Sequence, residues 1–503
     1  MNSRKAIFTL VIQILITIIG IISNKVILSS INPYLYGIYN YSFAIIGLFS
    51  IFSDFYFASV YFQRISSGGD TQKHFSTYVS IKAILLVIIA IALSLYLISG
   101  FFIFKSIDMI VAIIMCIVFL SYASEILFSS LITIFQAKRE VILSQSISLM
   151  IVLINMSYLI VFVRPSGNVY AFAASFLVKN IFGILLLSYA LRSKISIFKY
   201  YIDKRIFHDY VRFIVPLIPV TIVSSLYSIL DPILIKMFMS YKEVGMFSAS
   251  QKINALVLML SGSLMTLLYS SFSQAAFHKK YDEIQSLSNR ATKYISIPVV
   301  MISMYVVFNC AQFVEIFMDH KYLECMPIIQ VFMFQVILMS ISRTFDSIVM
   351  ATEKLKYVGV SGVALCLLAI ALNFVLIPKT LFGIRMFGLG PIGPALKSLI
   401  YYILSILVGS YYLKTRLNIT IYWRFLIHII LAIISGYISF TIIPFPHYIA
   451  GHVNLLTLFT ISFIKYSIIY IILLIAIREI NRNDYMYLIK VMGLKTKNTG
   501  GAE

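Results

Sequence analysis

Long apolar stretches recur from one end of this sequence to the other, separated by short polar segments. One of them, AILLVIIAIALSLYLI at residues 83–98, is apolar on every side of a helix. The hydrocarbon core of a bilayer is about 30 Å thick and needs roughly 20 apolar residues per helical span. Strands of a membrane barrel would instead alternate in polarity over about ten residues. The sequence therefore predicts an all-α polytopic membrane protein.

Composition supports the same class. Of the 503 residues, 60% are hydrophobic and 12% are charged, whereas about 25% are charged in an ordinary soluble domain. The apolar stretches predict about 14 transmembrane helices of roughly 20 residues or more. Their expected bounds are 6–30, 39–62, 80–104, 109–135, 141–163, 169–191, 210–239, 246–274, 291–316, 328–352, 357–377, 394–413, 425–443 and 455–477. The first run is too long for a signal peptide, so we expect it to be retained.

Basic residues are distributed unevenly over the loops. If the N-terminus is cytoplasmic, Lys and Arg are about four times as frequent in the inward segments as in the outward loops. This asymmetry predicts that the N- and C-termini are both cytoplasmic. It also accounts for much of the net charge of +21 without a nucleic-acid partner.

A basic and aromatic segment, RSKISIFKYYIDKRIFHD, divides the chain near its middle. We expect this segment to lie along the cytoplasmic surface of the membrane. The domains that follow from this division are an N-terminal lobe at 1–191, a cytoplasmic basic linker at 192–209, a C-terminal lobe at 210–413, an additional helix pair at 414–477 and a cytoplasmic tail at 478–503.

A short pattern occurs once in each predicted lobe. SSINPYLYGIYNYSFAI at 29–45 and MSYKEVGMFSASQKI at 239–253 share a polar turn followed by a glycine, Gly37 or Gly245. Repeated halves are typical of transporters, because a site between them can be exposed to each side of the membrane in turn. The pattern predicts two pseudo-symmetric lobes around a central cavity.

Several charged residues fall within the predicted spans, where each costs about 2.5–3.5 kcal/mol if it faces lipid. We expect them to face protein or a hydrated cavity. The bases are candidate contacts of a substrate: Lys25, Lys179, Lys236, Lys252, Arg343, Lys397 and Lys465. The acids are candidates for ion or proton coupling: Asp54, Glu125, Asp231 and Asp346. Because the bases outnumber the acids, the cavity is expected to attract an anionic substrate.

The depth of a lysine decides between two interpretations. Lys25, Lys236 and Lys397 lie near helix ends, where the side chain can extend to the membrane surface instead of facing a cavity. Lys179 and Lys465 lie near the middle of their spans and Lys252 lies inside its helix, which favours the cavity for these three.

Other interpretations stay open for three residues. Arg343 and Asp346 are three residues apart on one helix face and can pair with each other. Glu125 lies among small residues in SYASEILFSS, which suits close helix packing as well as a proton or ion site.

Sequence motifs of enzyme chemistry are absent. The chain contains neither G-x-x-x-x-G-K-[ST] nor H-E-x-x-H, and its four cysteines do not have the spacing of metal ligands. The sequence thus predicts no enzyme, no metal site and no cofactor, with H⁺ or Na⁺ coupling as a hypothesis.

Three segments resemble a known family. FIVPLIPVTIVSSLYSILDPILIKMFMSYKEVGMFSASQKI at 213–253 resembles the start of the second lobe in bacterial polysaccharide and O-antigen flippases of the multidrug/oligosaccharidyl-lipid/polysaccharide exporter superfamily. INPYLYGIYNYSFAI at 31–45 is similar to the matching turn of the first lobe, and 372–403 is similar to a later Gly-rich turn of that family. Together with the order of the spans, the resemblance covers nearly the whole chain.

The resemblance implies a fold of two lobes with alternating access, in the bacterial inner membrane. The implied substrate is an undecaprenyl-diphosphate-linked oligosaccharide, such as an O-antigen or capsular repeat unit, moved from the cytoplasmic to the periplasmic leaflet. Implied partners are membrane lipids, a polysaccharide polymerase and the chain-length machinery. Many members have about 12 spans, roughly 20 residues each, so the additional helix pair is a departure that resembles the longer lipid II flippases.

Three other functions remain as alternatives. A lipid II flippase or a drug/cation antiporter belongs to the same superfamily, but an antiporter should have a more acidic cavity. A membrane polysaccharide polymerase or glycosyltransferase belongs to a different class and would normally have a large outer loop, which this sequence lacks.

Overall fold

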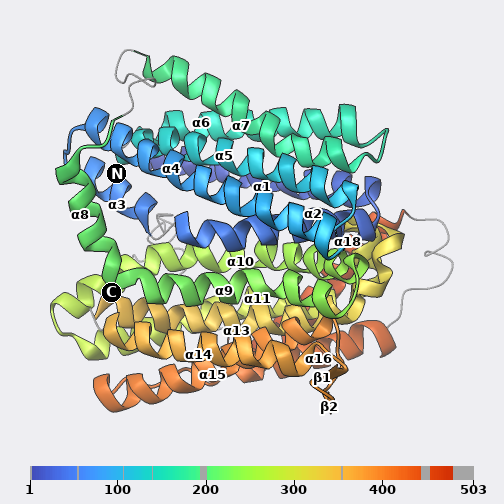
Figure 1. The fold of residues 1–503 in the computed structure, drawn as a ribbon. Helices are drawn as coiled ribbons and strands as arrows, with labels where there is room; N and C mark the ends of the chain where they lie inside the picture. The colour runs from blue at the N-terminus through green and yellow to red at the C-terminus, as the bar shows by residue number, and fades with distance from the viewer. Residues whose placement is uncertain are drawn as a thin grey trace. The chain divides into compact units, whose positions relative to one another are not determined.

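The computed structural model describes residues 3–53, 56–105, 107–138, 140–192, 201–352, 355–442 and 454–479. Helices make up most of these ranges, and the sheet that they contain is one two-stranded hairpin (Figure 1). The predicted all-α class is therefore confirmed. The predicted tail lies outside the described residues beyond Glu479, and so does the part of the linker at 193–200.

The elements have the following bounds. The α-helices are α1 Ser3–Ser30, α2 Pro33–Ser50, α3 Phe57–Ser66, α4 Thr71–Ile98, α5 Met109–Ala137, α6 Val141–Tyr158, α7 Val169–Leu191, α8 Lys204–Ile214, α9 Ile218–Phe238, α10 Tyr241–Phe277, α11 Tyr281–Phe308, α12 Cys310–Phe317, α13 Met326–Ala351, α14 Leu355–Leu376, α15 Ile392–Leu417, α16 Phe425–Tyr437 and α18 Leu455–Ala476. Tighter or wider helical turns are η1 Ile51–Ser53, η2 Ser99–Ile103, η3 Leu159–Val163, η4 Val215–Leu217, η5 His320–Cys325 and η6 Ile438–Ile442. The strands are β1 Thr380–Leu381 and β2 Ile384–Arg385.

Within the described residues, 11 helices are long and apolar enough to cross a membrane. The chain is thus a multi-pass membrane protein. Three of the expected spans are not among the 11. The span at 39–62 is divided into α2 and α3, and the span at 425–443 forms the shorter apolar helix Phe425–Thr441. The span at 246–274 falls within α10, where many side chains are outside the description.

The chain divides into two compact units, which we describe separately. The first comprises Met1–Leu256, Phe317–Phe332 and Lys354–Ser405, and the second comprises Val257–Ile316, Met333–Glu353 and Ile406–Glu503. Their bounds differ from those of the expected lobes, because α10, α13 and α15 contribute to both units. The two lobes and the cavity between them stay a prediction.

Side chains at the helix ends explain where several spans begin. Asn32 accepts a hydrogen bond from the backbone of Leu35, and Pro33 occupies the first position of α2, where its missing N–H costs nothing. Asp70 caps α4 in the same way. In the 213–225 segment, where prolines predict a bend, the turn η4 separates α8 from α9.

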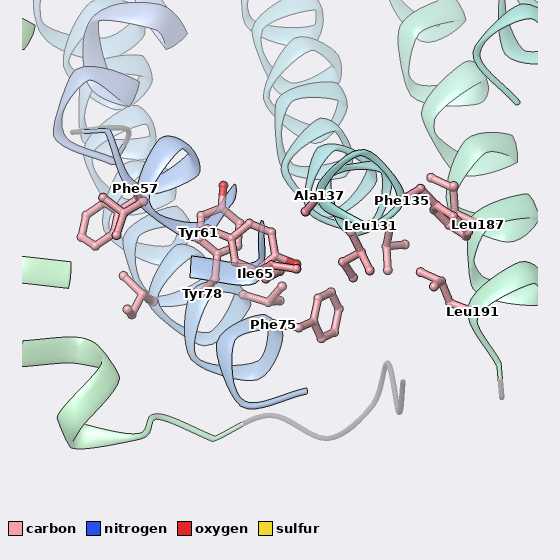
Figure 2. Packing of buried hydrophobic residues seen from close by; sticks show 14 of the residues in the cluster. Phe57, Tyr61, Ile65, Phe75, Tyr78, Leu131, Phe135, Ala137, Leu187 and Leu191 are labelled. Carbon is pink, nitrogen blue, oxygen red and sulfur yellow. The ribbon is translucent and has the colours of Figure 1, made fainter. Parts of the chain in front are cut away.

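A buried hydrophobic cluster holds one end of the first unit together (Figure 2). The rings of Tyr61 in α3 and Tyr78 in α4 stack with centroids 4.4 Å apart. Leu131 of α5 and Leu187 of α7 belong to the same cluster. Tyr210 of α8 is also part of the cluster, and Arg64 forms an ion pair with Asp209 of the same helix at 2.8 Å. The described part of the linker is therefore packed on the first unit.

Candidate functional site

Two lysines and a glutamate from three helices form a group that we call the accessible cluster: Glu125 of α5, Lys179 of α7 and Lys252 of α10. The ammonium nitrogen of Lys179 lies 4.0 Å from a carboxylate oxygen of Glu125, and these side chains are 27% and 45% exposed. Lys252 interacts electrostatically with Lys179 and keeps accessible surface, although protein atoms surround it on most sides. The structure thus brings together three residues that the sequence singles out.

The packing of α5 against α7 fixes the position of Lys179 (Figure 1). The next residue, Asn180, is 1% exposed and donates hydrogen bonds to two serines of α5, at 3.1 Å each. A Cβ atom on Gly183 would lie 2.6 Å from the ring of Phe128, so glycine permits this close approach. The small residues around Glu125 serve helix packing, while Glu125 itself reaches Lys179.

The accessible cluster carries more positive than negative charge. Lys179 lies near the middle of α7, and a charge at that depth costs about 2.5–3.5 kcal/mol unless it is compensated. Glu125 compensates one of the two ammonium groups. Lys179 also lies 5.1 Å from the centroid of the Phe176 ring, which can stabilise a cation. The remaining positive charge makes this cluster suited to an anion.

A second group of charges, the buried pair, consists of Asp231 in α9 and Lys397 in α15. The ammonium nitrogen of Lys397 lies 2.6 and 2.8 Å from the two carboxylate oxygens, and the side chains are 1% and 5% exposed. Asn373 of α14 donates a further hydrogen bond to Asp231, at 2.8 Å. Lys397 also lies 4.4 Å from the ring centroid of Tyr227. The two charges therefore neutralise each other within a closed hydrogen-bonded site.

This geometry corrects one interpretation of Lys397. Its extension to the membrane surface is wrong, because the side chain is 1% exposed and bonded to Asp231. Substrate contact by Lys397 and ion coupling by Asp231 stay predictions. In this structure the ammonium group of Lys397 and the carboxylate of Asp231 bind each other.

The other two candidate lysines of the first unit lie apart from these groups. Lys236, in the last turn of α9, lies 4.5 Å from the ring centroid of Tyr241. Lys25 is half-buried in α1. Their roles as substrate contacts stay predictions, and the candidate acid Asp54 lies outside the described residues.

Three candidates belong to the second unit. Lys465 of α18 donates a hydrogen bond to the backbone carbonyl of Ser439, at 2.6 Å. Arg343 is half-buried and Asp346 is exposed on α13. Both residues are described and no ion pair joins them in the structure, but the positive charge of Arg343 acts on the Asp346 carboxylate, so their pairing stays a prediction. The roles of Arg343 and Lys465 as substrate contacts and of Asp346 in coupling stay predictions.

Sequence reasoning missed Lys82, which is 2% exposed in α4. It donates a hydrogen bond to the backbone carbonyl of Ser53, at 2.6 Å, at the end of η1. The expected span at 80–104 placed Lys82 at a membrane surface, but α4 already begins at Thr71. The capping residue Asp70 was the available signal, because it marks the start of the helix.

A second missed group lies in the second unit. Glu479 is 1% exposed and accepts a hydrogen bond from the hydroxyl of Tyr422, at 2.6 Å. Arg424 forms an ion pair with it at 2.6 Å, and Nε2 of His428 lies 3.7 Å away. The other ring nitrogen of His428 lies 2.7 Å from Ser296 of α11. These contacts join the end of α18 to α16 and α11.

The glycines of the repeated pattern meet at a crossing of α2 and α10. A Cβ atom on Gly37 would lie 1.7 Å from the carbonyl oxygen of Tyr241, and one on Gly245 would lie 1.9 Å from the carbonyl oxygen of Pro33. Each carbonyl belongs to the residue four positions before the other glycine. The contact is therefore reciprocal, as expected for two related segments, and only glycine fits at both positions.

Comparisons with known proteins agree on the family and the fold. The sequence profile of the family described as "Polysaccharide biosynthesis protein" matches residues 3–276. No curated protein matches the sequence. The structure resembles that of the lipid II flippase MurJ in an inward closed conformation, with a TM-score of 0.70 and 14% identity over 97% of this chain and 99% of that chain.

A second solved structure extends the comparison. This is an inward-facing multidrug resistance MATE family transporter of the MOP superfamily, with a TM-score of 0.56 and 13% identity over 82% of this chain and 99% of that chain. At identities this low, the similarity establishes a shared fold. The substrate has to be inferred from the residues of the site.

Proposed function

Because this chain belongs to the polysaccharide biosynthesis protein family, we propose that it is a flippase for an undecaprenyl-diphosphate-linked oligosaccharide. It would move an O-antigen or capsular repeat unit from the cytoplasmic to the periplasmic leaflet of a bacterial inner membrane. Both termini would be cytoplasmic, and the polymerase and chain-length machinery would use the translocated product.

The accessible cluster is the observation that carries this proposal. It contains two ammonium groups and one carboxylate, which pairs with Lys179 near the middle of α7. A diphosphate supplies the missing negative charge and accepts several charge-assisted hydrogen bonds. Within this proposal, the sugars occupy the hydrated interior and the polyprenyl chain stays in the lipid. No enzyme chemistry is needed for this translocation.

The crossing of α2 and α10 supports alternating access. The backbones of α2 and α10 touch at Gly37 and Gly245, with no side chain between them. This contact can therefore close the path of the substrate completely. Transport would require the two helices to separate there. A Gly37→Ala substitution places a methyl group against the Tyr241 carbonyl, so we expect transport to be lost while the accessible cluster still binds diphosphate.

Ion coupling belongs to the same proposal. We assign it to Glu125 in preference to Asp231, because the carboxylate of Glu125 is accessible and that of Asp231 is enclosed with Lys397. Binding of a proton or a sodium ion at Glu125 would change the charge that Lys179 presents to the substrate. Transport driven by an imposed gradient, compared between the wild type and Glu125→Gln, measures this role.

A lipid II flippase is the second candidate, favoured by the fold shared with MurJ over nearly the whole chain. Lipid II is also a diphosphate-linked lipid, so the accessible cluster suits both substrates and the attached sugars would distinguish them. A drug/cation antiporter is disfavoured, because the excess positive charge of the cluster repels organic cations.

Reconstituted vesicles test the proposal. The substrate is a fluorescent undecaprenyl-diphosphate-linked oligosaccharide, and dithionite destroys the label in the outer leaflet only. We expect the protein to raise the fraction of label that dithionite reaches, and Lys179→Gln/Lys252→Gln to abolish this rise. Lys279→Gln/Lys280→Gln, which removes two exposed charges elsewhere, should behave as wild type.

Two outcomes would count against the proposal. Equal activity of wild type and Lys179→Gln/Lys252→Gln would remove the accessible cluster from the mechanism. Transport of a labelled lipid II in preference to the oligosaccharide lipid would favour the second candidate.

A further inference from the structure

The hairpin between α14 and α15 presents apolar side chains at one end of the first unit. Phe382 at its tip is 95% exposed, Ile384 is 63% exposed and Phe387 is 70% exposed. Figure 1 shows β1 and β2 extending from the ends of these helices. An exposed apolar group of this size at a loop tip indicates a surface that it contacts.

The tip has an unfavourable backbone conformation for its sequence. Leu381 pairs with Ile384, so Phe382 and Gly383 form a two-residue turn with φ of 51° and 81°. Turns of this kind favour Asn-Gly, because both central residues adopt positive φ. A phenylalanine in this conformation is rare and costly. Because the ring of Phe382 does not pack within the hairpin, we expect contacts outside the hairpin to offset this cost.

The base of the hairpin is fixed to the helix that precedes it. The backbone N–H of Met386 donates to the carbonyl of Lys379 at 2.9 Å, and that of Gly388 donates to the carbonyl of Pro378 at 2.8 Å. The N–H of Leu389 donates to the carbonyl of Leu376 in the last turn of α14, at 2.9 Å. The tip is therefore held in a defined place at the end of α14.

The length of the hairpin sets the depth of the tip. Three residues separate the base at Lys379 from Phe382, which allows a rise of at most about 10 Å. The polar layer of a bilayer is about 5–7 Å thick on each side of the hydrocarbon core. Because the candidate span Gly359–Leu376 ends just before the hairpin, we expect the base to lie near the membrane surface and the tip to stay at or near the depth of the lipid head groups.

Two cations flank the apolar tip. Lys379 and Arg385 are both exposed, on opposite sides of the turn. Lysine and arginine near a membrane surface attract anionic lipids. Aromatic rings between cations are typical of segments that insert into the interface.

We propose that the hairpin Thr380–Arg385 inserts its Phe382 tip among the lipid head groups, where Lys379 and Arg385 bind anionic phospholipids. Because the hairpin joins α14 to α15, this contact anchors the ends of the helices that carry Asn373 and Lys397. The anchor is independent of the proposed substrate.

Tryptophan fluorescence tests the insertion. The chain has one native tryptophan, so Phe382→Trp in a Trp423→Phe background reports on the tip alone. The full-length protein is reconstituted in phosphatidylcholine vesicles with phosphatidylglycerol and a lipid that carries a quencher at a chosen depth. We expect stronger quenching by a label near the head group than by a label at the end of the acyl chain.

The cations are tested in the same background. Adding Lys379→Gln/Arg385→Gln should reduce quenching in vesicles with phosphatidylglycerol, at least twofold, and should have little effect in pure phosphatidylcholine. Equal elution volumes in size-exclusion chromatography control for folding. If no lipid label quenches the fluorescence of the Phe382→Trp variant, the proposal is overturned and the tip is assigned to a partner outside the membrane.

Discussion

The accessible cluster and the buried pair both place charges inside the membrane-spanning part of the first unit, but they treat these charges differently. In the buried pair, one ammonium group meets one carboxylate at 2.6 Å, and both side chains are almost fully enclosed. In the accessible cluster, Lys179 lies 4.0 Å from the carboxylate of Glu125, Lys252 adds a second positive charge that acts on Lys179, and the side chains retain accessible surface. A lysine within a span is therefore not by itself a sign of substrate binding.

We expect accessibility and charge balance to separate structural charges from ligand-binding charges. A buried pair in which every charge is matched has no remaining affinity for an ion, and its main contribution is to fix the helices that carry it. A partly exposed cluster with an unmatched charge attracts a counter-ion, and desolvation strengthens that attraction.

The largest effect is expected from Lys397→Met. This change leaves Asp231 buried without its cation, which should destabilise the protein by about 3–5 kcal/mol. Thermal unfolding and yield in detergent measure the loss. Asp231→Leu/Lys397→Met removes both charges and should recover most of the stability. An unchanged melting temperature for Lys397→Met would contradict the structural role of the pair.

The next effect concerns ligand binding at the accessible cluster. Each of Lys179→Gln and Lys252→Gln should weaken diphosphate binding by about 1.5–3 kcal/mol, the size of a hydrogen bond to a charged group. The melting temperature should change little, because partly exposed ion pairs contribute little to stability. Calorimetric titration with inorganic diphosphate checks the affinity. A strong loss of stability with unchanged affinity would assign these lysines to the fold instead.

Ionic strength should separate the two groups further. Salt screens accessible charges over about 10 Å at 0.1 M but acts weakly on enclosed pairs. Raising the salt concentration should weaken diphosphate binding in the wild type. It should leave the stability difference between the wild type and Lys397→Met nearly unchanged. Salt-independent binding would show that the anion is held away from the accessible cluster.

The smallest effect is expected from Glu125→Gln. The 4.0 Å ion pair with Lys179 is partly exposed, so its removal should cost about 0–1 kcal/mol of stability. Diphosphate affinity should rise slightly, because a competing negative charge is lost. Weaker diphosphate binding in this variant would mean that Glu125 orients Lys179 for the ligand.

The sequence predicted much of the fold because apolar length reports directly on the membrane. The helical class and 11 of the expected spans follow from that signal. The division of the span at 39–62 could not be predicted in this way, since the break between α2 and α3 depends on contacts such as Lys82 with Ser53. The glycine pattern at Gly37 and Gly245 identified two related segments, but their direct contact was not predicted.

The candidate site was predicted less well. Depth favoured Lys179 and Lys252 over Lys397, but Lys397 stayed a candidate substrate contact and Asp231 a candidate for coupling, and neither was expected to pair with the other. Their pairing joins α9 to α15 across a long stretch of chain, and no local pattern reports such a contact. Asn373 was missed because an amide carries no charge that would stand out in an apolar span.

Binding of farnesyl diphosphate, a soluble prenyl diphosphate, measures whether the accessible cluster holds a diphosphate. Calorimetric titration would compare the wild type with Lys179→Gln/Lys252→Gln and with Asp231→Leu/Lys397→Met. We predict that the first variant loses affinity by at least tenfold, equivalent to about 1.4 kcal/mol, whereas the second binds as the wild type does. Equal binding by the wild type and Lys179→Gln/Lys252→Gln, or loss of binding only in Asp231→Leu/Lys397→Met, would contradict the account.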